Sequence, residues 1–241
     1  MKFKVLIVVF LLLSGSLFSQ INNETSKEKE ERMAWWTEAR FGMFIHWGLY
    51  ALPARHEWVM SKEQISRTDY EKYVDYFDPD LYNPNEWAKL AKAAGMKYVV
   101  FTAKHHDGFC MFDSKFTDYK VTNAPIGRDL LKELVDAFRG QGIRVGLYYS
   151  LIDWHHPDFT VKDPIHPERN NKLALAEDKN RNNKRFQEYL KNVILIFIII
   201  ELGHIFSAPK IIQILKMVWF MKTNLIIFLN FLEEKQVHKV A

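Results

Sequence analysis

Histidine side chains follow two short apolar runs in this sequence. His105 and His106 come shortly after residues 97–103, and His46 lies near the end of residues 41–47. Runs of this length are typical of buried strands, and α/β barrels carry their chemistry at the C-terminal ends of their strands. A neutral imidazole offers one hydrogen-bond donor and one acceptor, which suits hydroxyl groups. The spacing therefore predicts an enzyme site that binds a polyol or a sugar.

Further side chains in two other segments favour the same chemistry. Glu57 and Trp58 fall in the expected first strand-to-helix loop, where a carboxylate can accept hydrogen bonds from hydroxyls while the indole stacks on a sugar face. An acid on a loop surface is the equally simple interpretation of Glu57. Tyr148 and Tyr149 end a third apolar run, and alternation along a strand predicts that they face opposite sides. One of them then faces the barrel interior.

Metal binding is a weaker interpretation of the histidine pair. His105, His106 and Asp107 are adjacent in the sequence, and adjacent ligands converge poorly on one ion. No His-x-x-x-His pattern supports them, and Cys110 is the only cysteine. A lone histidine such as His46 is also often a satisfied core residue. We therefore expect no metal and no cofactor.

Helical patterns alternate with the apolar runs, and this order defines the fold. Helices between short apolar strands force the strands to pair in parallel, as in an α/β protein. The chain supplies about three β/α units of a (β/α)8-type, TIM-like barrel, which do not close the barrel. The expected strands are residues 41–47, 97–103 and 144–150, and the expected helices are residues 85–94, 129–139 and 181–192.

The N-terminal residues predict export. Residues 1–20 combine a short basic start, an apolar stretch and small residues, as in a secretory signal peptide, so the protein is expected to be periplasmic or secreted. Residues 21–34 form a polar lead-in. The formal net charge of +4 is spread without a basic stripe, so nucleic acid is not an expected partner.

Residues 193–241 differ from the rest in composition. They contain eleven of the chain's isoleucines, whereas residues 1–192 contain eight, and no aspartate follows Asp178. Such a shift is typical of A/T-rich codons read out of frame, although a real apolar segment could look similar. A membrane span is not expected, because Lys210, Lys216 and Lys222 interrupt the apolar runs.

Together, these segments resemble the α-L-fucosidases of glycoside hydrolase family 29 over residues 35–192. The matching stretches are WWTEARFGMFIHWG (35–48), Glu57-Trp58, AAGMKY (93–98), KHHDGF (104–109) and GLYYS (146–150). The resemblance implies a (β/α)8-related catalytic domain that releases L-fucose from glycans by a retaining mechanism. It also implies that one set of residues lines the fucose pocket: His46, Glu57, Trp58, His105, His106 and Tyr148.

The catalytic carboxylates are not assigned in this sequence. The family's nucleophile is an aspartate at the end of the fourth barrel strand, expected here after Asn192 in a Trp-x-Asp type segment, and the acid/base lies further along. Residues 218–221 read Val-Trp-Phe-Met and contain no carboxylate. We therefore expect this chain, as an incomplete barrel, to have negligible fucosidase activity.

Two other functions stay open at this point. The first is a noncatalytic fucose-binding protein that keeps the pocket, and the second is a membrane-associated protein that uses the apolar tail. The expected partner is a fucosylated glycan or glycoconjugate. The sequence does not indicate the oligomeric state.

Overall fold

A computed structural model describes residues 25–202 of the chain, and residues 39–193 form a compact unit. Its sheet has three parallel strands in the order β1-β2-β3: Gly42–Ile45, Tyr98–Lys104 and Arg144–Tyr149. This confirms the expected strands and their parallel pairing. The first strand is shorter than expected, so His46 and Trp47 lie in the loop that follows it.

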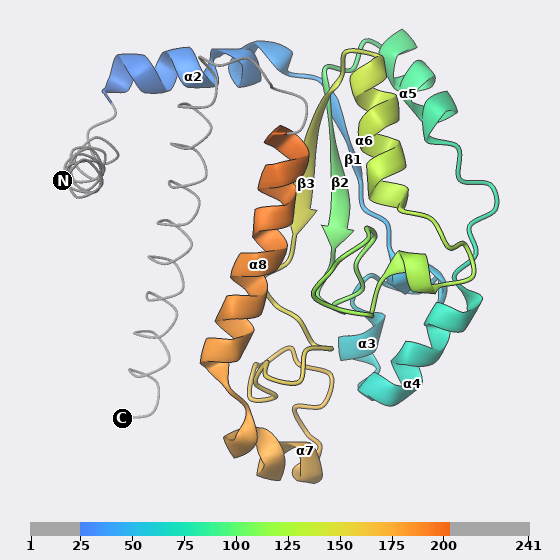
Figure 1. Cartoon of the computed structure of the whole chain (residues 1–241), viewed down its shortest axis with the longest axis vertical. Helices are drawn as coiled ribbons and strands as arrows, with labels where there is room; N and C mark the ends of the chain where they lie inside the picture. The colour runs from blue at the N-terminus through green and yellow to red at the C-terminus, as the bar shows by residue number, and fades with distance from the viewer. Residues whose placement is uncertain (1–24, 203–241) are drawn as a thin grey trace, which may run out of the picture. The chain divides into compact units, whose positions relative to one another are not determined.

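Two amphipathic helices connect the strands. Helix α5 (Pro84–Ala93) joins β1 to β2, and α6 (Leu130–Gly140) joins β2 to β3. Each begins at a side chain that accepts a backbone N–H: Asn83 accepts from Glu86, and Asp129 accepts from Lys132. The two helices pack side by side along the sheet (Figure 1). Both agree with the sequence prediction to within two residues.

The third expected helix is longer than its prediction. Helix α8 spans Asn183–Leu202, and Asn182 accepts the Arg185 backbone N–H at its start. The fourth strand expected after Asn192 therefore does not follow directly, because the chain stays helical through Leu202. The 218–221 segment and the rest of the tail lie outside the described residues.

Part of the polar lead-in, residues 21–34, is helical, and the sequence analysis predicted no helix there. Helix α2 spans Ser26–Ala39. Thr25 accepts the Glu28 N–H at 3.2 Å, while Glu28 accepts the Thr25 N–H at 2.9 Å. This reciprocal pair is a capping box, a start signal that the sequence prediction overlooked. The predicted signal peptide, residues 1–20, lies outside the described residues, so export stays a prediction.

Short helices fill the loops at the C-terminal end of the sheet, and none of them was predicted. The arrowheads of β2 and β3 point toward this end, where α3 and α4 lie (Figure 1). The short elements are η2 (Leu49–Ala51), α3 (Val59–Lys62), α4 (Arg67–Glu71), η3 (Lys72–Tyr76), η4 (Val121–Asn123), α7 (Lys172–Glu177) and η5 (Asp178–Asn180).

The core lies between β2 and the helices. Val99, Phe101 and Ala103 of β2 are fully buried, as are Leu134 and Phe138 of α6. Burial of the Val, Leu and Phe side chains contributes roughly 1.5–3 kcal/mol each, and this fixes the central strand. Across the described part of the chain, no helix has the length and apolar character needed to span a membrane.

A register shift marks the end of β2. Thr102 pairs with Tyr148, but Lys104 pairs with Tyr149, so β2 carries one extra residue there. A bulge of this kind bends the strand and changes the direction of the side chains that follow it. His105 and His106 come directly after the bulge.

Candidate functional site

Four of the predicted site residues converge at the C-terminal ends of the three strands. The ring centroid of His46, which follows β1, lies 5.0 Å from that of His105 and 6.1 Å from that of Tyr148. The rings of His105 and His106 lie 4.4 Å apart. Adjacent residues can share a side only where the regular strand has ended, as it has here. The geometry therefore forms one aromatic cluster from three neighbouring strands.

Tyr148 and Tyr149 face opposite sides of β3, as alternation predicts. Tyr148 lies 6.0 Å from His105, measured between ring centroids. Tyr149 instead lies beneath the buried Lys104, whose Nζ is 4.8 Å from the Tyr149 ring centroid. Only Tyr148 joins the cluster.

Trp58 closes one side of the cluster from the β1 loop. Its ring lies edge-on to His106 at 5.4 Å and to Trp154 at 6.2 Å. The Trp154 ring is 5.3 Å from His106, so two indoles enclose this imidazole. Trp154 lies in the loop between β3 and α7. Flat apolar faces beside hydrogen-bonding imidazoles match the needs of a sugar ring.

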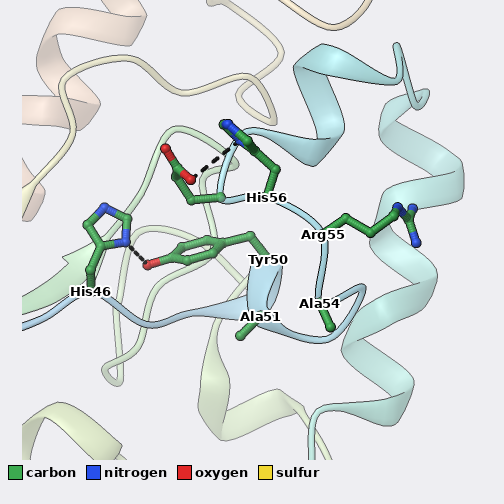
Figure 2. A pocket seen from close by; sticks show the side chains of 7 residues that line it. His46, Tyr50, Ala51, Ala54, Arg55 and His56 are labelled. Carbon is green, nitrogen blue, oxygen red and sulfur yellow. Dashed lines mark hydrogen bonds and ion pairs between the residues drawn. The ribbon is translucent and has the colours of Figure 1, made fainter.

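A pocket of about 570 Å³ opens beside His46 (Figure 2). Its lining residues are His46, Tyr50, Ala51, Ala54, Arg55, His56 and Glu57. The Glu57 side chain is 44% exposed, so its carboxylate reaches solvent in this pocket. Arg55 is held at the edge by Glu63, with two short contacts of 2.6 and 2.7 Å.

Tyr50, which the sequence prediction missed, holds the His46 ring. The Tyr50 hydroxyl lies 2.8 Å from His46 Nδ1 (Figure 2), and burial raises the pKa of Tyr50 far above its usual range. The hydroxyl therefore stays protonated. The only sequence signal is the four-residue separation, which in a short 3₁₀ turn brings the two side chains together.

His56 leaves the Glu57 carboxylate available to a ligand. His56 Nδ1 accepts the Trp58 backbone N–H at 2.8 Å, so the proton of the neutral ring is on Nε2. Glu57 Oε2 lies 3.4 Å from the same Nδ1. Two acceptors do not form a hydrogen bond, so the neutral ring leaves this oxygen free to accept one from a ligand.

The two adjacent histidines are neutral. Burial is the main reason why the pKa of His105 is lowered to about 2, and the neighbouring His106, His46 and Lys104 act in the same direction. Burial also lowers the pKa of His106 to about 4, with Lys104 the next cause. Neutral rings can both donate to and accept from hydroxyl groups.

A buried ion pair supports the cluster from below. Lys104 Nζ lies 3.1 Å from Asp153 Oδ2, and both side chains are at most 2% exposed. Burial alone raises the pKa of Asp153, but Lys104, His155 and His156 outweigh it and the pKa is lowered. Asp153 also accepts the backbone N–H groups of His155 and His156. This arrangement fixes the loop that carries Trp154.

Asp107 does not join the histidines. Its buried carboxylate accepts the Tyr70 hydroxyl at 3.1 Å and the Phe109 N–H at 3.2 Å. Burial raises the pKa of Asp107 to about 6. Within residues 25–202, no group of three His, Cys, Asp or Glu side chains is arranged to hold a metal ion.

Comparison with known proteins identifies the family. The family model described as "Alpha-L-fucosidase" matches residues 17–197. Alpha-L-fucosidase isoenzyme 1 from Paenibacillus thiaminolyticus is 55% identical, with a TM-score of 0.68 over 70% of this chain and 40% of that one. Tissue alpha-L-fucosidase of Homo sapiens is 40% identical over 142 residues, covering 52% of this chain and 30% of that protein.

A third relative was solved with a ligand. The glycoside hydrolase family 29 α-L-fucosidase of Bacteroides thetaiotaomicron, trapped as a covalent intermediate with 2-fluoro-fucosyl fluoride, is 36% identical, with a TM-score of 0.56. The match covers 66% of this chain and 36% of that one. The chain thus spans well under half the length of these three relatives.

The fold agrees with these matches. Fucosidases of this family have a TIM-barrel catalytic domain, and a three-stranded parallel sheet with connecting helices is consistent with part of such a barrel. The matched region contains the whole aromatic cluster. The chain belongs to the α-L-fucosidase family, glycoside hydrolase family 29, and corresponds to the N-terminal region of its catalytic domain.

Proposed function

We propose that this chain carries the fucose-binding part of an enzyme that hydrolyses α-L-fucosides, and that its site binds the terminal fucose of glycans. The observation that carries the proposal is the convergence of His46, His105, His106 and Tyr148 at three adjacent strand ends, with Trp58 beside them. Neutral imidazoles can bond the ring hydroxyls, and the indole can cover an apolar sugar face.

The reaction proposed for the family is a retaining one. The trapped covalent intermediate of the Bacteroides relative supports a mechanism in which a carboxylate attacks the anomeric carbon. A second carboxyl protonates the leaving oxygen as the glycosidic bond breaks, and the two groups lie roughly 5–5.5 Å apart in such enzymes. Water completes the hydrolysis and restores the nucleophile.

We infer that the 241-residue chain binds fucose but turns it over at a negligible rate. The nucleophile is expected as an aspartate after residue 192, and the last aspartate of the sequence is Asp178. Asp107 and Asp153 do not replace it, because both are buried and committed to hydrogen bonds or an ion pair. A noncatalytic fucose-binding protein is the second candidate that this observation favours.

The unusual composition of residues 193–241 supports a shifted reading frame as its origin. Translation of the coding DNA in the other two frames beyond codon 192 tests this. A strand followed by a Trp-x-Asp segment in another frame is the expected result. If neither frame gives one, the second candidate, a fucose-binding protein, becomes the better proposal.

Two measurements on the purified chain test the function. Calorimetric titration is expected to show binding of L-fucose but not of its enantiomer D-fucose, and release of the aryl group from an aryl α-L-fucoside is expected to match a blank. A folded chain that does not bind L-fucose would contradict the proposed site. Turnover well above the blank that a fucose-like inhibitor abolishes would contradict the inferred inactivity.

A further inference from the structure

Ser150 decides which nitrogen of His106 carries the proton. Ser150 Oγ lies 2.8 Å from the Ile152 carbonyl oxygen, which can only accept, so the hydroxyl proton is donated there. His106 Nδ1 lies 2.5 Å from the same Oγ. Because the hydroxyl has a single proton, this second bond requires His106 Nδ1–H as the donor.

The His106 ring therefore presents its other nitrogen as an acceptor. A neutral imidazole has one proton, and burial keeps the His106 ring neutral with a pKa of about 4. With the proton on Nδ1, Nε2 has a lone pair and no hydrogen. Nothing in residues 25–202 donates a hydrogen bond to Nε2, so this lone pair remains open to a ligand.

The surroundings hold the ring and its partner in place. Ser150 is 4% exposed, so water does not compete for its hydroxyl. The His106 carbonyl oxygen accepts the Trp154 backbone N–H at 2.8 Å, and the rings of Trp58 and Trp154 enclose the imidazole. The orientation of Nε2 is thus set before any ligand binds.

We propose that Ser150 is a positioning residue that makes His106 Nε2 an obligate acceptor, so that the site selects a sugar presenting a hydroxyl donor at that point. The identity of the sugar as fucose rests on the proposed function above. The assignment of the His106 proton to Nδ1 does not depend on that proposed function. A hydrogen-bond acceptor at that position of the ligand, such as a fluorine or a methyl ether, would lose this bond.

Nitrogen NMR of the full chain labelled with ¹⁵N-histidine tests the tautomer without any ligand. The His106 signals are assigned by their loss in His106→Gln. We expect the proton on Nδ1 in the wild type, a mixed or Nε2–H ring in Ser150→Ala, and return to Nδ1–H in Ser150→Thr. A wild-type Nε2–H ring, or no change in Ser150→Ala, would overturn the proposal.

Ser61→Ala is the matched control for these spectra. Ser61 is 3% exposed and its hydroxyl donates to the Ile165 carbonyl at 2.6 Å, but it does not contact a histidine ring. The control removes the same kind of buried bond and is expected to leave the His106 signals unchanged. If it shifted them as much as Ser150→Ala, the effect would be a general loosening and the proposal would fail.

Binding of monodeoxy sugars tests the consequence for selectivity. Ser150→Ala is expected to weaken L-fucose binding about tenfold, as for loss of one hydrogen bond. Among 2-, 3- and 4-deoxy-L-fucose, the one that lacks the donor to Nε2 should bind wild type and variant equally. Equal weakening for all three would overturn the selectivity claim. If no fucose binds while the tautomer is as expected, the proposed function fails and the assignment of the proton stands.

Discussion

The two walls of the site are built differently. One, here called the inner wall, consists of His105, His106 and Tyr148 with Lys104 and Asp153 beneath them. Lys104 is fully buried, and His105 and Asp153 are at most 3% exposed. The inner wall is therefore part of the folding core.

The other wall, here called the outer wall, comes from the end of β1 and its loop, with His46, Tyr50 and Glu57. His46 and Glu57 are exposed, and only Tyr50 beneath them is buried. The polar contacts of the outer wall join residues that are close in the sequence, such as His46 and Tyr50. The comparison teaches that substitutions in the inner wall should change stability, whereas substitutions in the outer wall should change ligand binding alone.

The largest effect is expected where the inner wall loses its buried cation. Lys104→Met leaves the Asp153 carboxylate buried beside a group that cannot neutralise it. Removing one partner of a buried pair costs about 3–5 kcal/mol. Urea denaturation followed by tryptophan fluorescence should show the free energy of unfolding falling by this amount.

Lys132→Met provides the matched control on the surface. Lys132 pairs with Asp136 at 2.6 Å, but these side chains are 70% and 47% exposed. An exposed pair four residues apart on a helix contributes about 0.3–0.5 kcal/mol. Equal losses in the two variants would show that the inner wall has no special role in stability.

The next effect depends on pH and concerns Asp107. Its pKa rises from an ordinary 3.8 to about 6 in the folded chain, mainly because of burial. The folded state then binds the proton more tightly, so this contribution to stability is full below pH 3.8 and is lost as pH rises through 6. The difference between these two pKa values corresponds to about 3 kcal/mol over the whole titration.

Asp107→Asn removes this titration and keeps a side chain of the same shape. Between pH 4 and pH 7, the variant should gain stability relative to the wild type by roughly 2 kcal/mol, because part of the wild-type contribution is already lost at pH 4. Denaturant midpoints measured at both values check this. A difference between the two proteins that does not change with pH would refute the raised pKa.

The third and smaller expected effect is a difference in stability between alanine variants at two glycines. Gly108 and Gly95 share a φ of +83°, a conformation that costs an L-residue about 1–2 kcal/mol. A Cβ on Gly108 would overlap Asp153 Oδ1 and lie 2.8 Å from His155 Cβ, whereas a Cβ on Gly95 meets nothing within 4 Å. Gly108→Ala should therefore lose about 1–3 kcal/mol more than Gly95→Ala, measured by thermal denaturation. Equal losses would show that the loop of Asp153 moves freely.

The inner wall was largely predictable from the sequence. The apolar runs and helix caps define the strands and helices, and a parallel sheet brings its C-terminal strand ends together. His105, His106 and Tyr148 therefore meet as their positions along the chain predict. The chemical roles of Lys104 and Asp153 could not be inferred, because their contact joins residues 49 positions apart through a bulge that no local pattern indicates.

The outer wall was predicted less well. Residues 49–76 form four short helices, and short turns are set by tertiary contacts more than by propensity. The hydrogen bond between Tyr50 and His46 depends on such a turn, so Tyr50 was missed. The start of α2 is a different case, since its Thr25 and Glu28 capping box was readable in the sequence.

The smallest effect on stability, and the clearest separation of the walls, is expected from Glu57→Gln. The Glu57 carboxylate lines the pocket and is exposed, so the substitution should leave the urea midpoint unchanged while weakening L-fucose binding about tenfold in calorimetry. Glu133→Gln is the control, because the partly exposed Glu133 carboxylate pairs with Arg128 and neither residue lines the pocket. A fall in stability without loss of binding would place Glu57 in the fold and not in the site. In that case the sugar would be held by the inner wall alone.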